Sequence, residues 1–215
     1  IATMYGFNAG SFDWNELHEF QHNSLKFLRG DITKQHSFEY YDSNTDFSVS
    51  GNTLDGEVNW ILSMPGIEEI FDKSSSPDSP KLIVEGRLIG GCIDCIAKLI
   101  GTPYDGTGEF VKKYPRKIWF MDNFAMSAFD LYLTMMQMKY CGYFEGTTAI
   151  VFGRTMFPDK SDEEYIAQLR QAIPDIPFIW NADIGHVEPC FTVINGAYGI
   201  VTCAQGKGAL EQALV

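Results

Sequence analysis

From residue 82 onward, short apolar runs alternate with longer segments in which apolar residues recur every three or four positions. A short apolar run predicts a buried strand, and the longer period predicts a helix that buries one face. The runs predict strands over residues 82–84, 117–121, 149–152 and 177–180, and the periodic segments predict helices over residues 92–100, 125–140 and 161–172. Strands that alternate with helices are typical of a parallel or mixed sheet covered by helices, so the sequence predicts an α/β fold.

Local signals mark where several of these elements begin or turn. Ser161 and Glu164 have the spacing of a capping box at the start of the third predicted helix. Gly90-Gly91 is expected to break the chain between the first strand and the first helix, because glycine weakens both elements. Asn195-Gly196 predicts a hairpin turn within residues 190–204, which adds an antiparallel edge to the sheet.

The first third of the chain is less regular. Apolar residues at helical spacing predict a helix over residues 13–28, with Asp13 as its cap. Residues 38–49 are aromatic but interrupted by turn formers, so they predict only short strand pairing. Residues 72–80 consist mostly of Ser, Pro and Asp and predict an exposed loop. The chain begins at Ile1 and not at Met, from which we expect a fragment or a chain cut from a longer protein.

Composition narrows the class of protein. With 215 residues, 45% of them hydrophobic, the chain can bury a substantial core. The 28 acidic and 16 basic residues give a net charge of −12, which opposes a nucleic-acid partner. No apolar run approaches the roughly 20 residues of a membrane span, and no export signal opens the sequence. The five cysteines are odd in number and scattered, which favours reduced thiols and a cytoplasmic protein without disulfides.

Two polar residues at the ends of predicted strands are the main candidates for chemistry. Asp122 follows the apolar run Ile118–Met121, so its carboxylate leaves a buried strand and needs a hydrogen-bond donor. His186 follows Gly185 in a non-helical segment after the strand over 177–180. The carboxyl ends of parallel strands meet at one rim of a sheet, so the carboxylate is expected to orient the imidazole as in a hydrolytic triad. The alternative is that Asp122 caps the following helix.

The third member of such a triad is missing from the sequence. No serine or cysteine has the small flanking residues of a nucleophile elbow. Cys92 is the alternative nucleophile, and its C-x-x-C spacing with Cys95 also resembles redox and zinc sites, although core thiols are the simpler reading. His18 and His22 are four residues apart, the spacing of a metal pair, but no third ligand is evident.

Four blocks of sequence occur in an order that resembles the LD-carboxypeptidase family. They are Glu85–Gly91, Gly101–Tyr104, Ile118–Asp122 and Ile184–His186. This family of serine peptidases includes the muropeptide LD-carboxypeptidases and the microcin C immunity peptidases. Thr3–Gly6 also resembles the strand that follows the nucleophile region of the family.

The resemblance covers only the C-terminal portion of the family. It implies a swivelling β/β/α-type domain with a mixed sheet over residues 46–215, and over residues 1–45 the end of the nucleophile domain with a helical connector. The serine would lie on an N-terminal domain that this chain lacks. By resemblance His186 is the general base, and Asp122 is the acid at a position where the family usually has Glu. Cys92 stands where the family usually has Asn.

The resemblance further implies a cytoplasmic enzyme of peptidoglycan recycling. It would hydrolyse the amide between an L- and a D-residue of a muropeptide, without a metal or organic cofactor, and could form a homodimer. Arg87 and Glu85 would bind a charged peptide terminus, the alternative being a surface ion pair. The chain alone would be inactive. Two other functions stay open, namely a microcin-immunity-type peptidase that cleaves a peptidyl-nucleotide amide and a non-catalytic binding domain.

Overall fold

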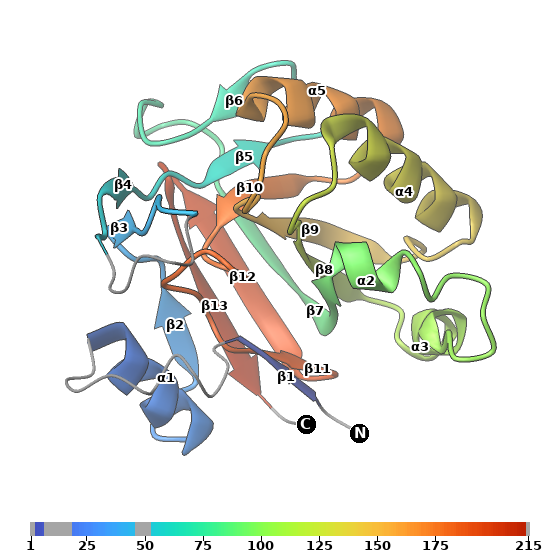
Figure 1. Ribbon diagram of the computed structural model, residues 1–215, viewed down its shortest axis with the longest axis horizontal. Coiled ribbons are helices and arrows are strands. Elements are labelled where there is room, and N and C mark those ends of the chain that lie inside the picture. Colours follow the sequence, from blue (N-terminus) through green and yellow to red (C-terminus); the bar gives the residue numbers. More distant parts are fainter. Residues whose placement is uncertain (1–2, 7–18, 46–52, 214–215) are drawn as a thin grey trace.

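The computed structural model describes residues 3–6, 19–45 and 53–213, and its centre is a mixed sheet of nine strands. Four neighbouring strands are parallel, namely β7 (Leu82–Cys92), β8 (Lys117–Asp122), β9 (Thr147–Gly153) and β10 (Phe178–Ala182). Antiparallel strands extend both edges: β12 (Tyr198–Ala204), β13 (Lys207–Ala213) and β2 (Lys34–His36) beyond β7, and β5 (Ile61–Ser63) and β6 (Ile70–Phe71) beyond β10. The predicted α/β fold with a mixed sheet is therefore confirmed (Figure 1).

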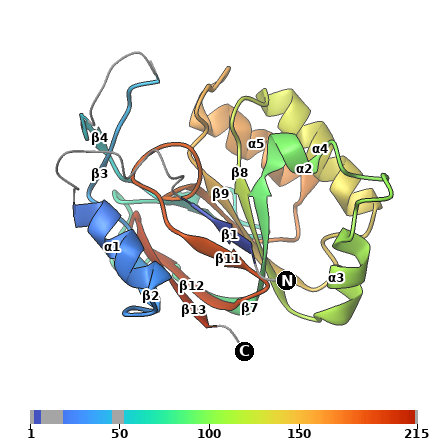
Figure 2. The ribbon, with the colours of Figure 1, turned by 60° about the horizontal axis from the view of Figure 1, so that its bottom comes forward.

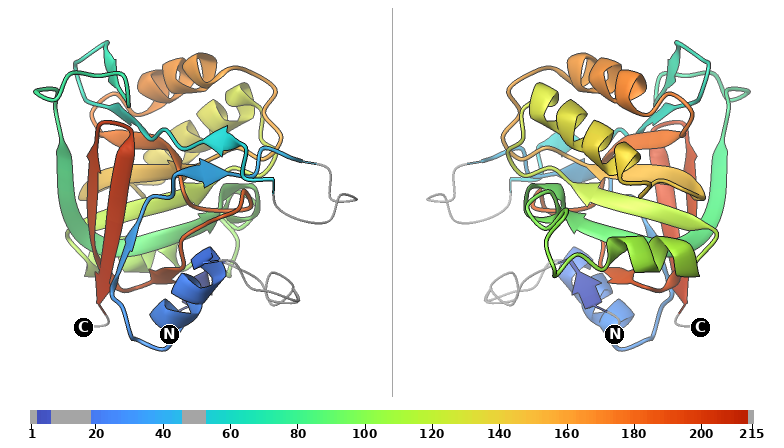
Figure 3. Two further views of the ribbon diagram at one scale, coloured as in Figure 1. Left: turned by 90° about the vertical axis from the view of Figure 1, so that its left-hand side faces the viewer. Right: turned by 90° about the vertical axis from the view of Figure 1, so that its right-hand side faces the viewer.

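The helices lie on two sides of this sheet. Four lie on one side, α2 (Ile93–Ile96), α3 (Thr107–Lys113), α4 (Ala128–Tyr140) and α5 (Asp162–Ala172), whereas α1 (Glu19–Leu28) lies on the other side near β2 and β13 (Figures 1 and 2). In Figure 3, α4 and α5 lie next to each other over the same face of the sheet. The capping box at the start of α5 is present as predicted, because Ser161 accepts from the amide of Glu164 and Glu164 accepts from the amide of Ser161.

Strand β8 separates two hydrophobic clusters and is buried on both faces. Ile118 and Phe120 belong to the cluster inside the curved sheet, while Trp119 and Met121 belong to the cluster beneath α4 and α5. All six residues of the strand are buried. Each large apolar side chain buried in this way stabilises the fold by about 1.5–3 kcal/mol. Asp122 is therefore carried to its position by a strand whose register is firmly fixed.

Strand β7 is longer than predicted, and the helix after it is shorter. The strand continues through Gly90 and Gly91, where a break was expected. A Cβ atom on Gly90 would lie 1.7 Å from the carbonyl oxygen of Phe120, so glycine serves here to let β8 approach. The predicted helix over residues 92–100 is reduced to the single turn α2.

The predicted hairpin at Asn195-Gly196 is wrong. Strand β11 (Val193–Asn195) pairs with β1 (Thr3–Tyr5), and the amide of Gly196 donates to the carbonyl of Leu88 at 2.8 Å. The hairpin instead joins β12 to β13 through Gln205-Gly206, with φ values of 49° and 75°. Two consecutive positive φ values suit the tight turn of a two-residue hairpin.

The N-terminal predictions are confirmed where the structure describes them. Helix α1 covers the later part of the predicted helix, and residues 13–18 lie outside the described residues. Strands β3 (Tyr40–Tyr41) and β4 (Gly56–Glu57) form a short pair, as expected for this region. The division at residue 46 stays a prediction. The longest described helix, α4, has 13 residues, and no described helix has both the length and the apolar character of a membrane span.

Candidate active site

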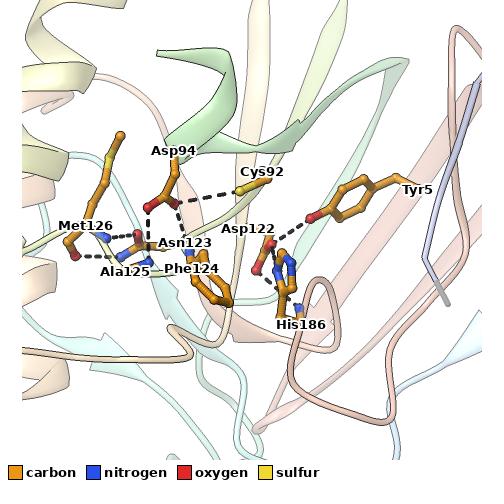
Figure 4. Close-up of polar contacts among 9 residues, drawn as sticks. All are labelled: Tyr5, Cys92, Asp94, Asp122, Asn123, Phe124, Ala125, Met126 and His186. Atoms are coloured by element: carbon orange, nitrogen blue, oxygen red, sulfur yellow. Dashed lines mark hydrogen bonds and ion pairs between the residues drawn. The ribbon is translucent and has the colours of Figure 1, made fainter. Parts of the chain in front are cut away.

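Asp122 and His186 meet at the carboxyl end of β8. Asp122 is the last residue of β8, and His186 lies in the loop after β10. The imidazole Nδ1 is 2.5 Å from the carboxylate Oδ2 (Figure 4). The structure thus brings together the two side chains that the sequence placed at one rim of the sheet, and this arrangement can orient an imidazole for proton transfer.

The carboxylate of Asp122 is fully buried and receives several hydrogen bonds. The hydroxyl of Tyr5 donates to Oδ2 at 2.6 Å, and the backbone amide of His186 donates to Oδ1 at 3.4 Å. Tyr5, Asp122 and His186 converge in Figure 4 although β1 and β8 are far apart in the sequence. These donors compensate for the loss of water around a buried carboxylate.

The side chain of His186 is partly exposed. Its side chain keeps 42% of its surface exposed, whereas that of Asp122 has none exposed. The ring of Phe124 packs against the imidazole ring, with centroids 4.7 Å apart and the ring planes tilted by 58°. Within the described part of the chain, the second ring nitrogen, Nε2, has no hydrogen-bond partner. Nε2 is therefore available to exchange a proton with a reacting group.

The pKa of His186 is raised above its usual value. The hydrogen bond to Asp122 is the main cause, and the charges of Asp122 and Asp94 act in the same direction, while burial partly opposes them. A histidine whose charged form is favoured in this way accepts a proton readily, as a general base requires.

Gly185 makes the close approach of the loop to Asp122 feasible. It has a φ of 107°, and a Cβ atom there would lie 2.0 Å from Oδ1 of Asp122. Gly153 has a similar role one strand away, because a Cβ atom there would lie 2.0 Å from the carbonyl oxygen of Ile184. The loop of residues 183–192, between β10 and β11, is called the histidine loop. A side chain at either glycine would push this loop away from β8 and β9.

A buried ion pair anchors the start of the same loop. Oδ1 of Asp183 is 2.6 Å from the guanidinium of Arg154, and the side chains of both are almost fully buried. Oδ2 of Asp183 accepts from the indole of Trp60 at 3.2 Å and from the amide of Phe38 at 3.0 Å. Sequence reasoning gave Asp183 no role of its own. The available signal was a base and an acid that follow predicted strands by two and three residues.

Asp122 does not cap helix α4, so that alternative is wrong. The N-cap is Ser127, whose hydroxyl accepts from the amide of Asp130 at 3.1 Å. Between β8 and the helix, the carboxylate of Asp94 accepts from the amides of Phe124 at 2.9 Å and Ala125 at 3.1 Å. Asp122 is therefore left to its contacts with Tyr5 and His186.

Cys92 lies beside Asp122 but has the wrong chemistry for a nucleophile. The two residues are opposite each other in the β7–β8 register, and Sγ points to Asp94 Oδ2 at 3.8 Å (Figure 4). Burial is the main cause that raises the pKa of the Cys92 thiol to about 12, so the thiol is protonated at neutral pH. The described residues contain no group of three or more metal-ligating side chains, and of the predicted histidine pair His18 lies outside them.

Glu85 and Arg87 lie elsewhere on β7. They precede Cys92 by seven and five residues, and at about 3.3 Å per residue this places them roughly 23 and 17 Å from its end. Arg87 donates to the carbonyl of Gly196 at 2.8 Å, and Glu85 is 3.8 Å from the guanidinium of Arg116. The structure does not bring these two residues to Asp122 and His186, and their role in substrate binding stays a prediction.

Comparisons with known proteins show the family of the chain. A family model described as the LD-carboxypeptidase C-terminal domain matches residues 85–200, which is more than half of the chain. The chain belongs to this family. The resemblance found in the four sequence blocks is thereby confirmed. Among curated proteins, no sequence match was found.

Solved structures show that this LD-carboxypeptidase C-terminal domain is similar in fold to longer proteins. The muramoyltetrapeptide carboxypeptidase from Oxalobacter formigenes has a TM-score of 0.65 at 15% identity, with 99% of this chain and 62% of that chain covered. An MccF-like protein from Streptococcus pneumoniae in complex with AMP has a TM-score of 0.66 at 18% identity, covering 99% and 63%. The microcin self-immunity protein MccF, as an inactive mutant without ligand, has a TM-score of 0.71 at 17% identity, covering 100% and 61%. The chain thus spans less than two thirds of the length of these proteins.

Proposed function

We propose that this chain supplies the general base, His186, and its orienting acid, Asp122, to a serine-type carboxypeptidase. The substrate is a muropeptide, and the bond hydrolysed is the amide between an L- and a D-residue. The observation that carries this proposal is the 2.5 Å contact between the buried carboxylate and an imidazole whose side chain is 42% exposed. Membership of the LD-carboxypeptidase family supports the same class of chemistry.

The proposed reaction is acyl transfer to serine. Nε2 of His186 takes the proton of a serine hydroxyl as the serine oxygen bonds to the carbonyl carbon of the amide. Donors outside this chain stabilise the oxyanion of the tetrahedral intermediate. The C–N bond then breaks, and the imidazolium gives its proton to the leaving amine. In the second half, Nε2 removes a proton from water as the water oxygen bonds to the carbonyl carbon of the acyl-serine ester. The bond from that carbon to the serine oxygen then breaks, and the imidazolium returns its proton to the serine.

The nucleophile is proposed to lie on an N-terminal domain of a longer protein. Two observations support this. The chain spans about 62% of the length of the muramoyltetrapeptide carboxypeptidase, and the thiol of Cys92 has its pKa raised to about 12, mainly by burial. Asp122 is one methylene shorter than the usual Glu. It still reaches Nδ1 of His186 at 2.5 Å, and Gly185 allows this close approach of the loop.

We also propose a cytoplasmic role in peptidoglycan recycling. All five cysteines are unpaired, which is typical of a reducing compartment. Homodimer formation stays a prediction.

The test is hydrolysis of a muramoyl tetrapeptide by the complete protein that contains this chain. We expect release of the terminal D-residue, and loss of release in His186→Gln and Asp122→Asn. Loss of a triad member typically lowers kcat by about 10⁴-fold or more. His36→Gln, on β2 at the far edge of the sheet, is the matched control and should keep full activity. The 215-residue chain alone should release nothing.

The same assay distinguishes the proposed function from the two alternative functions. A peptidyl-nucleotide amide is offered in parallel, and cleavage of this amide in place of the tetrapeptide would identify a microcin-immunity-type peptidase. A complete protein that cleaves neither substrate would contradict the proposed function and favour a binding domain. Activity that persists in His186→Gln would also contradict it, because the base would then be another residue.

A further inference from the structure

The hydroxyl of Tyr5 and the imidazole of His186 share one carboxylate oxygen. Oδ2 of Asp122 is 2.6 Å from the tyrosine hydroxyl and 2.5 Å from Nδ1 of the histidine. Tyr5 lies 117 residues before Asp122 in the sequence, so this contact exists only in the folded chain. Charge-assisted hydrogen bonds of this length are among the stronger ones in proteins.

The position of Tyr5 is fixed by the strand that carries it. β1 pairs with β11, and the side chain of Asn195 donates to the hydroxyl of Thr3 at 3.2 Å. The same side chain accepts from the amide of Gly90 at 2.9 Å and donates to its carbonyl at 3.1 Å. The ring of Tyr5 lies 5.9 Å from that of Phe120 between centroids. Asn195 therefore ties β1 to β7, next to the strand that bears Asp122.

We propose that Tyr5 is a positioning residue of this site, which holds Oδ2 of Asp122 on the imidazole and limits how strongly the carboxylate retains the imidazole proton. The inference rests on the proposed function, because it assigns His186 the role of base. Tyr5 itself touches neither substrate nor reacting atoms in this scheme.

The physical basis is competition for one oxygen. Burial, followed by the charge of Asp122, raises the pKa of Tyr5, so its hydroxyl is a protonated donor at neutral pH. A carboxylate that already accepts one strong hydrogen bond is less basic toward a second donor. The hydrogen bond from Tyr5 therefore weakens the stabilisation that Asp122 gives to the imidazolium of His186. A general base works best when its pKa lies near the working pH.

The other titratable groups around the pair come from three segments. Asp94 of α2 adds a negative charge that raises the pKa of His186 further. Cys92 of β7 and Cys190 of the histidine loop have thiol pKa values raised by burial, so both are neutral at neutral pH. Glu188, also in this loop, contributes a carboxylate close enough to act on Cys190. None of them donates to Oδ2 of Asp122 within the described residues, so Tyr5 has no substitute there.

The first test uses the 215-residue chain and needs no activity. In Tyr5→Phe, NMR titration of the His186 ring should show a pKa above that of the wild type, because Asp122 has lost a competing donor. Tyr143→Phe is the matched control, since it removes a tyrosine hydroxyl from another carboxylate, Asp105, and should leave His186 unchanged. An unchanged or lowered pKa of His186 in Tyr5→Phe would overturn the inference.

The second test is the pH profile of kcat/KM for the complete protein. The acid limb should move to higher pH in Tyr5→Phe, so that activity falls severalfold near about pH 6 and recovers at alkaline pH, with KM unchanged. A loss of stability alone would lower activity at every pH. Failure of the proposed function would appear differently, as full activity in His186→Gln or no activity in the wild type. The NMR result on Tyr5→Phe does not depend on activity and tests the inference separately.

Discussion

Replacing Gly185 with alanine should break the contact between Asp122 and His186. The new Cβ atom would lie 2.0 Å from Oδ1 of Asp122, which is about 1.5 Å short of ordinary contact. Asp122 is fully buried at the end of a strand and cannot swing into solvent. The histidine loop must therefore retreat, and a retreat of this size takes Nδ1 out of hydrogen-bond reach of Oδ2.

The size of the effect on stability can be built from two parts. A non-glycine residue in the left-handed region costs roughly 1–2 kcal/mol, and the φ of Gly185 is 107°. Overpacking adds about 1–3 kcal/mol. Gly185→Ala should thus lower the free energy of unfolding by roughly 2–5 kcal/mol. Gly101→Ala is the matched control, because its φ of 81° is also positive but no heavy atom lies within 4 Å of the new Cβ.

Two assays on the 215-residue chain check this prediction. Urea unfolding should show a larger loss for Gly185→Ala than for Gly101→Ala, and the excess measures the clash with Asp122. NMR titration should show the pKa of His186 falling toward its usual value in Gly185→Ala only, because the main cause of its rise is the bond to Asp122. Equal losses in the two variants, with the pKa of His186 still raised, would refute the reasoning.

Three further predictions follow from the site and its supports. Because Asp122 raises the pKa of His186, the stability that this contact provides is complete below about pH 6.5 and is lost as pH rises through the folded-state pKa. The urea midpoints of wild type and His186→Gln should therefore converge at alkaline pH, and a constant difference between them would contradict this. Arg154→Met leaves Asp183 buried without its partner and should cost about 3–5 kcal/mol in chemical unfolding, where a loss below about 1 kcal/mol would show that the pair is not needed. Burial raises the pKa of Cys92 to about 12, so iodoacetamide at neutral pH should modify Cys92 more slowly than the exposed cysteines. Mass spectrometry measures the rates, and faster modification of Cys92 would make it a candidate nucleophile again.

The elements that the sequence predicted well are those with strong local signals. The apolar run before Asp122 is a strand buried on both faces, and the capping box of Ser161 and Glu164 starts α5. The meeting of Asp122 with His186 was also predictable, because both follow strands of one parallel sheet. These inferences need only the residues themselves and a general rule about sheets.

The features that escaped prediction depend on distant segments. Gly90 lies inside β7 because only a residue without a Cβ atom leaves room there for the carbonyl of Phe120. No local pattern reveals this neighbour. Asn195 does not form a hairpin turn. It is the last residue of β11, which pairs with β1 from the start of the chain. Tyr5 reaches Asp122 for the same reason. Each error came from assigning a local role to a residue whose partner is far away in sequence.

The pairing of β1 has a consequence for motion in the site. Within the described residues, this strand of three residues pairs with β11 alone, through three register positions in a separate two-stranded sheet. In contrast, β8 is paired on both sides in the nine-stranded sheet. Short elements with few backbone partners open at a smaller free-energy cost than the whole domain. Detachment of β1 would withdraw the hydroxyl of Tyr5 and leave Asp122 and its strand in place. The protonation of His186 is then coupled to local opening at the N-terminal strand, independently of global unfolding.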